Sequence, residues 1–215
     1  MKRAVILDLD NCLAAADEVG RHLLEPAFDA IREASGGTLS GEALSEAFSD
    51  CWRHPLDRVA ARHGFSPAML AAGWKALSTI EVTTPMHGYG DLAELATLAA
   101  LGVRLFLVTS GFRRLQESKI RALVLAPLFT ATFVDAIDEP ERKGKLGLFR
   151  LILERYRLAP GDVLVVGDSP ESEIAAGNQL GIDTVQILRP GVPRTSAATF
   201  HVGSLAELRY LSRHA

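Results

Sequence analysis

The chain has 215 residues, and its 23 Lys and Arg against 26 Asp and Glu give a formal net charge of −3. Proteins held to a phosphate backbone carry a clustered excess of basic residues, whereas both signs are scattered along this chain, so a nucleic-acid polymer is excluded as a partner. With 48% hydrophobic and 23% charged residues, the composition is typical of a globular protein and excludes extensive disorder.

The patterns of apolar residues do not indicate a membrane protein. The longest uncharged apolar stretch, residues 122–134, contains Pro127 and is shorter than the about 20 residues of a membrane helix. The apolar run that follows the first basic residues, Ala4–Leu7, is too short for a secretory signal. We therefore expect a cytoplasmic protein with no membrane partner. The two cysteines, Cys12 and Cys51, lie too far apart to indicate a zinc site or a disulfide framework.

The first expected element is a buried strand at Ala4–Leu7, a short apolar run that ends at Asp8. The interval 14–85 contains helical patterns separated by glycines and a proline, and no convincing strand. We interpret this interval as an all-helical domain inserted into the chain, which returns to the sheet through Pro85–Gly90. Its helices are expected at His22–Ala34, Ser40–Trp52, Pro55–His63 and Ser66–Leu77.

From Val103 onward, short apolar runs alternate with helical patterns. This alternation predicts parallel strands joined by right-handed helical crossovers, which is a Rossmann-like, doubly wound, mainly parallel α/β sheet. Residues 1–13 and 86–215 would form this core. Further strands are expected at Val103–Val108, Thr132–Ile137, Val163–Val166, Thr184–Leu188 and Thr199–Val202, and helices at Arg113–Leu125, Leu146–Tyr156, Glu171–Leu180 and Ser204–Ser212.

Polar residues follow three of the expected strands: Asp8 and Asp10 after the first, Thr109 and Ser110 after the second, and Asp168 after the fourth. Because the carboxyl ends of parallel strands share one edge of a sheet, we expect these side chains to converge. Buried, ionised carboxylates repel one another, so a cation or a shared proton must compensate them. Oxygen ligands without His or Cys favour Mg²⁺ over Zn²⁺, and Mg²⁺ in turn suggests a phosphate substrate.

An aspartate can attack phosphorus and form an acyl phosphate where a cation screens the two anions and donors hold the phosphoryl oxygens. Asp8 is the candidate nucleophile. Asp10 is the candidate general acid and base, which would protonate the leaving oxygen and then take a proton from water. The expected donors to the phosphoryl oxygens are a hydroxyl from Thr109 or Ser110 and a lysine from Lys143 or Lys145.

These residues fall into four motifs whose order resembles that of the haloacid dehalogenase-like (HAD) superfamily of aspartate-nucleophile phosphohydrolases. The motifs are Asp8–Leu13, Val108–Gly111, a lysine before Phe149, and Val165–Pro170. The resemblance spans Lys2 to about Leu188 and implies a Rossmann-like core, with residues 14–85 as a mobile helical cap. It also implies that Mg²⁺ is bound by Asp8, Asp168 and the main-chain carbonyl of Asp10. The family's commonest spacing before Phe149 favours Lys143 over Lys145.

Two positions depart from the family pattern. Cys12 stands where a threonine is commoner, which removes a possible hydroxyl donor. The fourth motif often ends in aspartate, whereas Ser172 and Glu173 occupy the corresponding positions here, which leaves Glu173 as the better outer-shell partner of the metal. In the expected cap, His54, Arg58 and Arg62 recur at a spacing of four and share a helix face, which either contacts an anionic substrate or is simply solvated.

The sequence therefore predicts a Mg²⁺-dependent phosphatase that hydrolyses a small phosphorylated metabolite through an aspartyl-phosphate intermediate. Two alternatives stay open: a phosphomutase of the same superfamily, and a non-catalytic phosphate-binding regulatory protein. A dehalogenase would use the same attacking aspartate, but Asp10 argues against it, because dehalogenases of the family characteristically lack the second aspartate. The identity of the substrate and the number of subunits are left open.

Overall fold

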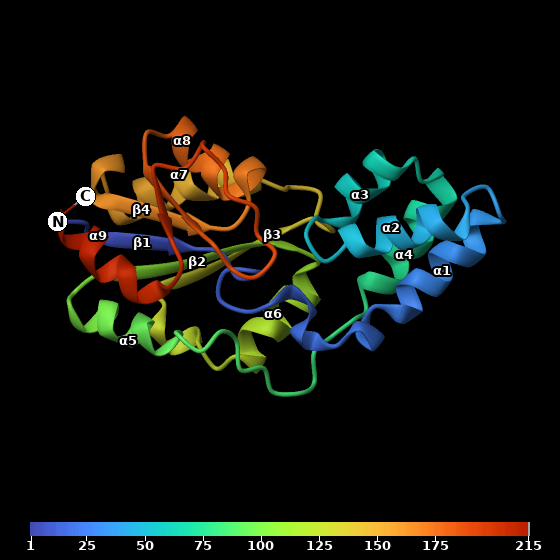
Figure 1. Cartoon of the computed structure of the whole chain (residues 1–215), viewed down its shortest axis with the longest axis horizontal. Coiled ribbons are helices and arrows are strands. Elements are labelled where there is room, and N and C mark those ends of the chain that lie inside the picture. The colour runs from blue at the N-terminus through green and yellow to red at the C-terminus, as the bar shows by residue number, and fades with distance from the viewer. Residues whose placement is uncertain (215) are drawn as a thin grey trace.

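A parallel β-sheet lies at the centre of the computed structural model, which describes residues 1–214 (Figure 1). Its strands lie in the order β3-β2-β1-β4-β5-β6, and each neighbouring pair is parallel. The strands are β1 (Ala4–Leu7), β2 (Arg104–Gly111), β3 (Ala131–Ala136), β4 (Val163–Gly167), β5 (Asp183–Ile187) and β6 (Phe200–Val202). The expected α/β class with a parallel sheet is therefore confirmed, including the short last strand.

The strand order reverses at β1, which has β2 on one side and β4 on the other. All the residues of β1 are buried, as expected for a strand that is covered on both faces. Leu7, its last residue, pairs with Leu107 and with Val166. The residues that follow these three positions therefore lie at one edge of the sheet, in the crevice where doubly wound folds bind their ligands.

Helices cover both faces of the sheet, because alternate residues of β1 point to opposite sides. Val5 and Leu7 belong to a buried cluster shared with α5, α6 and α9, whereas Ala4 and Ile6 belong to a second cluster shared with α7 and α8. These helices are α5 (Ala93–Ala100), α6 (Arg113–Ala122), α7 (Gly144–Tyr156), α8 (Ala175–Gln179) and α9 (Leu208–His214). None of the helices in residues 1–214 is long and apolar enough to cross a membrane.

The first four α-helices after β1 gather beyond one end of the sheet, apart from the core (Figure 1). We call them the helical lobe: α1 (Glu25–Ser35), α2 (Gly41–Asp50), α3 (Leu56–His63) and α4 (Pro67–Leu77). They pack around a buried cluster in which the ring of Phe28 stacks on that of Phe48, and which also includes Phe112 and Ile137 of the core. Ser40 and Ser66 cap α2 and α4, because their hydroxyls accept hydrogen bonds from backbone N–H groups three residues on.

The structure differs from the sequence-based expectation at several elements. α1 begins at Glu25 rather than His22, because residues 21–23 form a 3-10 turn. β2 runs on through Thr109 and Ser110, which pair with β3. The sequence patterns do not predict α5, whose residues are mostly Ala and Leu, so that no polar stripe marks its helical period.

Candidate active site

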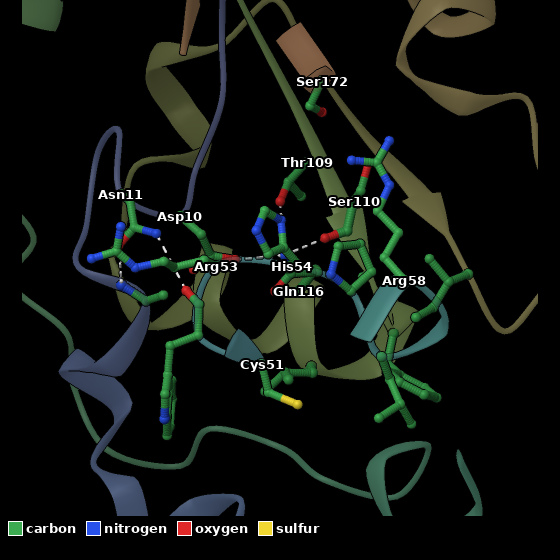
Figure 2. Close-up of a pocket in the computed structure, with 18 of the residues that line it drawn as sticks. Asp10, Asn11, Cys51, Arg53, His54, Arg58, Thr109, Ser110, Gln116 and Ser172 are labelled. Carbon is green, nitrogen blue, oxygen red and sulfur yellow. Dashed lines mark hydrogen bonds between the residues drawn. The ribbon is translucent and has the colours of Figure 1, made fainter. Parts of the chain in front are cut away.

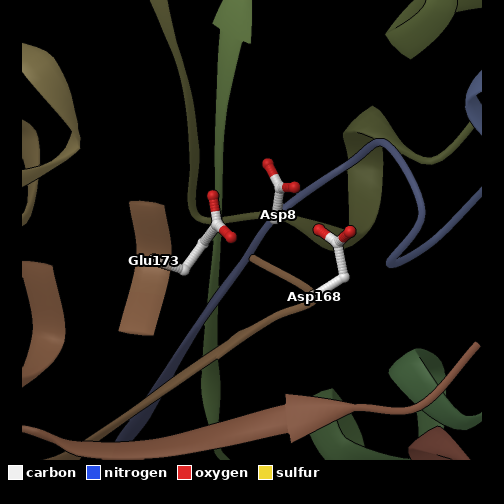
Figure 3. A group of neighbouring side chains, drawn as sticks. All are labelled: Asp8, Asp168 and Glu173. Carbon is white, nitrogen blue, oxygen red and sulfur yellow. The ribbon is translucent and has the colours of Figure 1, made fainter. Parts of the chain in front are cut away.

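Three carboxylates meet at the edge of the sheet where the strand order reverses (Figure 3). Asp8 directly follows β1, and Asp168 directly follows β4. Glu173 reaches the same place from Pro170–Ile174, a π-helical turn that takes the place of the expected first turn of α8. One oxygen of each carboxylate lies within 4.8 Å of the other two. Asp8 and Glu173 are buried, and Asp168 is partly buried.

A buried lysine pairs with two of these carboxylates. Lys145 Nζ lies 2.5 Å from Asp8 Oδ1 and also contacts Glu173 Oε1. The buried face of α7 consists of Lys145, Leu148, Phe149 and Ile152. Lys143 precedes the helix, lies off this face and is exposed. The structure thus brings Lys145, and not Lys143, to the carboxylates, although the spacing before Phe149 favours Lys143.

The charges of the site are not balanced by its own residues. Burial raises the pKa of Asp8 well above its usual value, and the charge of Glu173 raises it further, while Lys145 lowers it. Burial and the charge of Glu173 also raise the pKa of Asp168, to about 7. When all are ionised, three carboxylates and one ammonium leave an excess of negative charge. A divalent cation that prefers oxygen ligands would offset it, so this set of donors fits Mg²⁺.

Asp10 belongs to the same site but has different partners. Its Oδ1 lies 2.7 Å from Lys119 Nζ, and its Oδ2 accepts a hydrogen bond of 2.8 Å from Gln116 Nε2. Both partners are buried residues of α6. Gln116 and Lys119 are not among the residues predicted from the sequence. Their spacing of three on the helix that follows Thr109 is the signal that points to them, because it places both on one helix face.

The two hydroxyl residues near the end of β2 differ in how their protons are used. Thr109 is buried, and its Oγ1 accepts a hydrogen bond of 2.7 Å from Gln116 Nε2. The hydroxyl of Ser110 donates to Asp135 Oδ2 over 3.0 Å, and Asp135 also accepts a hydrogen bond from Arg142. Thr109 therefore donates its hydroxyl proton to no residue that the structure describes, which leaves it for a ligand, whereas the proton of Ser110 is already engaged.

A cavity opens between this edge of the sheet and the helical lobe (Figure 2). Its lining includes Asp8, Asp10, Thr109, Ser110, Lys119, Lys145, Asp168 and Glu173 from the core, and Trp52, Arg53, His54 and Arg58 from the lobe. Arg62 does not line the cavity, although it was expected on the same helix face as His54 and Arg58. It pairs with Asp50 instead, at 3.0 Å.

Cys12 belongs to the packing behind the site. The residue is fully buried, and it does not line the cavity formed by the described residues. Burial raises the pKa of its thiol well above the usual value, and the charges of Asp8 and Asp168 raise it further. Its carbonyl oxygen accepts a hydrogen bond from Arg189, which also forms a two-pronged ion pair with Asp91.

The sequence of this chain is similar to those of known proteins. The profile of the haloacid dehalogenase-like hydrolases matches residues 2–181. N-acylneuraminate-9-phosphatase of Rattus norvegicus is 34% identical over 122 residues, which make up 55% of this chain and 49% of that protein. Glyceraldehyde 3-phosphate phosphatase of Methanocaldococcus jannaschii is 25% identical over 200 residues, which make up 88% of this chain and 86% of that protein.

The fold of this chain is also similar to that of a solved structure. HAD-hydrolase YfnB of Bacillus subtilis, whose structure was solved bound to magnesium, matches with a TM-score of 0.65 and 17% identity over 98% of each chain. The match to the rat phosphatase spans about half the length of that relative. The family profile, in contrast, covers most of this chain. The chain therefore belongs to the haloacid dehalogenase-like hydrolases.

Proposed function

We propose that this protein is a Mg²⁺-dependent phosphatase that hydrolyses a small phosphomonoester through an aspartyl-phosphate intermediate. The observation that carries the proposal is that one cavity holds two aspartates in unlike surroundings. Asp8 is buried beside Lys145 and two other carboxylates, whereas Asp10 is 23% exposed and is held by residues of α6. Unlike surroundings allow two carboxyl groups to take unlike chemical roles.

Asp8 would be the nucleophile. Its carboxylate attacks phosphorus, and the bond between phosphorus and the leaving oxygen breaks as the new P–O bond forms. Lys145, which pairs with Asp8, and the free proton of Thr109 would bind the phosphoryl oxygens, where negative charge gathers. Water then attacks the phosphorus of the acyl phosphate, which releases inorganic phosphate and restores the carboxylate of Asp8.

Asp10 would be the general acid and base. It protonates the leaving oxygen in the first step and takes a proton from the attacking water in the second. Lys119 and Gln116 support this role, because each bonds a different oxygen of Asp10 and together they fix the plane of the carboxylate. The same two contacts keep Asp10 apart from the cluster of Asp8, Asp168 and Glu173.

Asp8 and Asp168 would hold Mg²⁺ together with the main-chain carbonyl of Asp10, and Glu173 would stand beside them. Bound there, the ion screens the repulsion between the phosphate and the attacking carboxylate. Two observations support this assignment: the oxygen donors of the cluster lie close together, and the structurally similar YfnB was solved bound to magnesium.

The helical lobe would serve as a cap over the catalytic core, with residues 14–85 as the cap domain and residues 1–13 and 86–215 as the core. The cavity between the two supports this proposal, because lobe residues and the carboxylates line it together. A phosphoryl group on Asp8 would leave the rest of the substrate facing the lobe. The names of the two similar phosphatases support a small phosphorylated metabolite as the substrate.

Replacing the two aspartates tests the mechanism. We expect Asp8→Asn to lose turnover of p-nitrophenyl phosphate and of an alkyl phosphate alike, by at least about 10³-fold, because no nucleophile is left. Asp10→Asn should slow the alkyl phosphate by about 10²–10⁴-fold. The release of p-nitrophenolate in the first step should be slowed much less, since this leaving group needs no proton, whereas hydrolysis of the acyl phosphate loses its general base with either ester. The measurement is steady-state turnover with Mg²⁺, and undiminished turnover by Asp8→Asn would contradict the mechanism.

Product analysis in the same assay separates the alternatives. A phosphatase releases one inorganic phosphate for each ester consumed. A phosphomutase returns the phosphoryl group to a second hydroxyl of the same molecule and releases little phosphate. A non-catalytic phosphate-binding regulatory protein binds phosphate esters without turning over any of them.

A further inference from the structure

The two sides of the cavity differ in charge: the described lining residues of the core carry both signs, whereas those of the lobe carry no negative charge. Among the described residues that line it, those of the lobe include Arg53, His54 and Arg58 but neither an aspartate nor a glutamate. Its acidic lining residues, Asp8, Asp10, Asp168 and Glu173, all belong to the core. A substrate whose phosphoryl group lies at the core therefore extends its other end toward the guanidinium groups of Arg53 and Arg58.

Among the described arginines that line the cavity, Arg58 has the most unused donors. Arg53 donates a hydrogen bond to a backbone carbonyl, and Arg142 donates to two carboxylates. The guanidinium of Arg58 donates no hydrogen bond to any described residue. Its ion pair with Glu171 has a separation of 3.6 Å, which is longer than a hydrogen bond. All five of its N–H groups are therefore available to a ligand.

The pair of Arg58 with Glu171 is one that a ligand can replace. The two side chains are 45% and 64% exposed, so water screens their attraction and each can move. Figure 2 shows His54 and Arg58 reaching from the lobe toward Thr109 and Ser110, across the cavity that all four line. Arg58 thus attracts a carboxylate from the side of the cavity where the leaving group of a phosphomonoester would lie.

We propose that Arg58 is a specificity-determining residue that binds a carboxylate on the leaving-group side of the substrate, so that the preferred substrates are phosphate esters of hydroxy acids. This inference rests on the proposed phosphatase function. The planar fork of a guanidinium matches a carboxylate through two parallel N–H···O bonds. Leu56 and Phe112 also line the cavity and offer apolar contacts to the carbon chain between phosphate and carboxylate.

Matched pairs of esters test the proposal. Each pair consists of an ω-phosphooxy alkanoate and the corresponding ω-phosphooxy alkanamide, which has nearly the same size but no negative charge at that end, in a series of increasing chain length. We expect the wild-type protein to prefer the acid in kcat/KM by about tenfold at the best chain length. Arg58→Met should lose this preference through a higher KM for the acid, while its kcat/KM for the amide stays unchanged.

Arg62→Met is the matched control. Arg62 lies one turn further along α3, pairs with Asp50 and does not line the cavity, so this variant should keep the preference for the acid. Glu171→Gln removes the competing carboxylate and should lower the KM for the acid alone. Because this variant leaves Arg58 in place, it tests the same claim if Arg58→Met does not fold.

Three results would overturn the proposal. Wild-type protein that hydrolyses acid and amide equally well has no carboxylate site, although it is still a phosphatase. Equal losses for both esters in Arg58→Met would show that Arg58 serves the phosphoryl group instead. Wild-type protein that hydrolyses no ester of either series, and no aryl phosphate, would contradict the proposed function itself.

Discussion

At the scale of the residue, burial distinguishes two neighbouring lysines, of which we propose that only Lys145 takes part in catalysis. Lys145 is buried against Asp8 and Glu173, so Lys145→Met would leave two close carboxylates without their ammonium. We expect turnover of p-nitrophenyl phosphate to fall by at least about 10²-fold, because the phosphoryl oxygens also lose a donor. Lys143→Met removes the same charge from an exposed position two residues away and should stay near wild-type turnover. Equal losses in both variants would contradict the assignment.

The residues of the site differ in how far the sequence predicts them. Asp8 and Asp168 are predictable because each follows a buried strand, and strand ends meet at one edge of the sheet. To predict Lys145, one must know which face of α7 is buried, and a residue count back from Phe149 does not give this. Lys119 was not predicted, because a lysine in a polar helix is ordinarily solvated. Only the folded chain brings its Nζ to within 2.7 Å of Oδ1 of Asp10.

At the scale of the element, the close approach of β4 to the π-helical turn depends on a glycine. A Cβ atom added at Gly167 would lie 2.5 Å from Cγ of Glu173. Gly167→Ala should therefore displace Glu173 from the carboxylate cluster and lower the affinity for Mg²⁺. It should also destabilise the fold by about 1–3 kcal/mol, as overpacking does. The measurement is the Mg²⁺ concentration at half-maximal turnover, together with the urea midpoint of unfolding.

Gly161→Ala is the control for this variant, because no atom lies within 4 Å of a Cβ added there. Its Mg²⁺ dependence should match that of the wild-type protein. If Gly167→Ala also shows the wild-type Mg²⁺ dependence, Glu173 does not contribute to the metal site.

The elements themselves were predictable to the extent that their patterns are local. β1 matches its expected bounds because its apolar run is short and ends at charged residues, and α2 and α4 begin where serine caps stand. α5 and the π-helical turn at Pro170–Ile174 were not predictable in this way. The apolar surface of α5 lacks a period, and the turn depends on contacts of Glu173 with residues distant in sequence, such as Lys145.

At the scale of the whole molecule, the crowded acids should make stability depend on pH. Burial, and then the charge of Glu173, raises the pKa of Asp168 from its ordinary value of 3.8 to about 7 in the folded protein. The folded state therefore holds a proton that the unfolded chain releases. This contribution to stability is fully present below about pH 4 and is lost as the pH rises through 7, with a slope of about 1.4 kcal/mol per pH unit between the two pKa values.

Magnesium should remove this dependence, since the ion and the proton compete for the same oxygens. In EDTA, the free energy of unfolding of the wild-type protein should fall relative to that of Asp168→Asn as the pH rises from about 4 to 7. Mg²⁺ at a hundredfold excess over its dissociation constant should raise the free energy of unfolding of the wild-type protein by about 2.7 kcal/mol at pH 7 and by much less at pH 4. Mg²⁺ should raise the free energy of unfolding of Asp168→Asn little at either pH. Urea unfolding followed by circular dichroism measures both effects. If the free energies of unfolding of the two proteins in EDTA run parallel with pH, the surroundings of Asp168 do not raise its pKa.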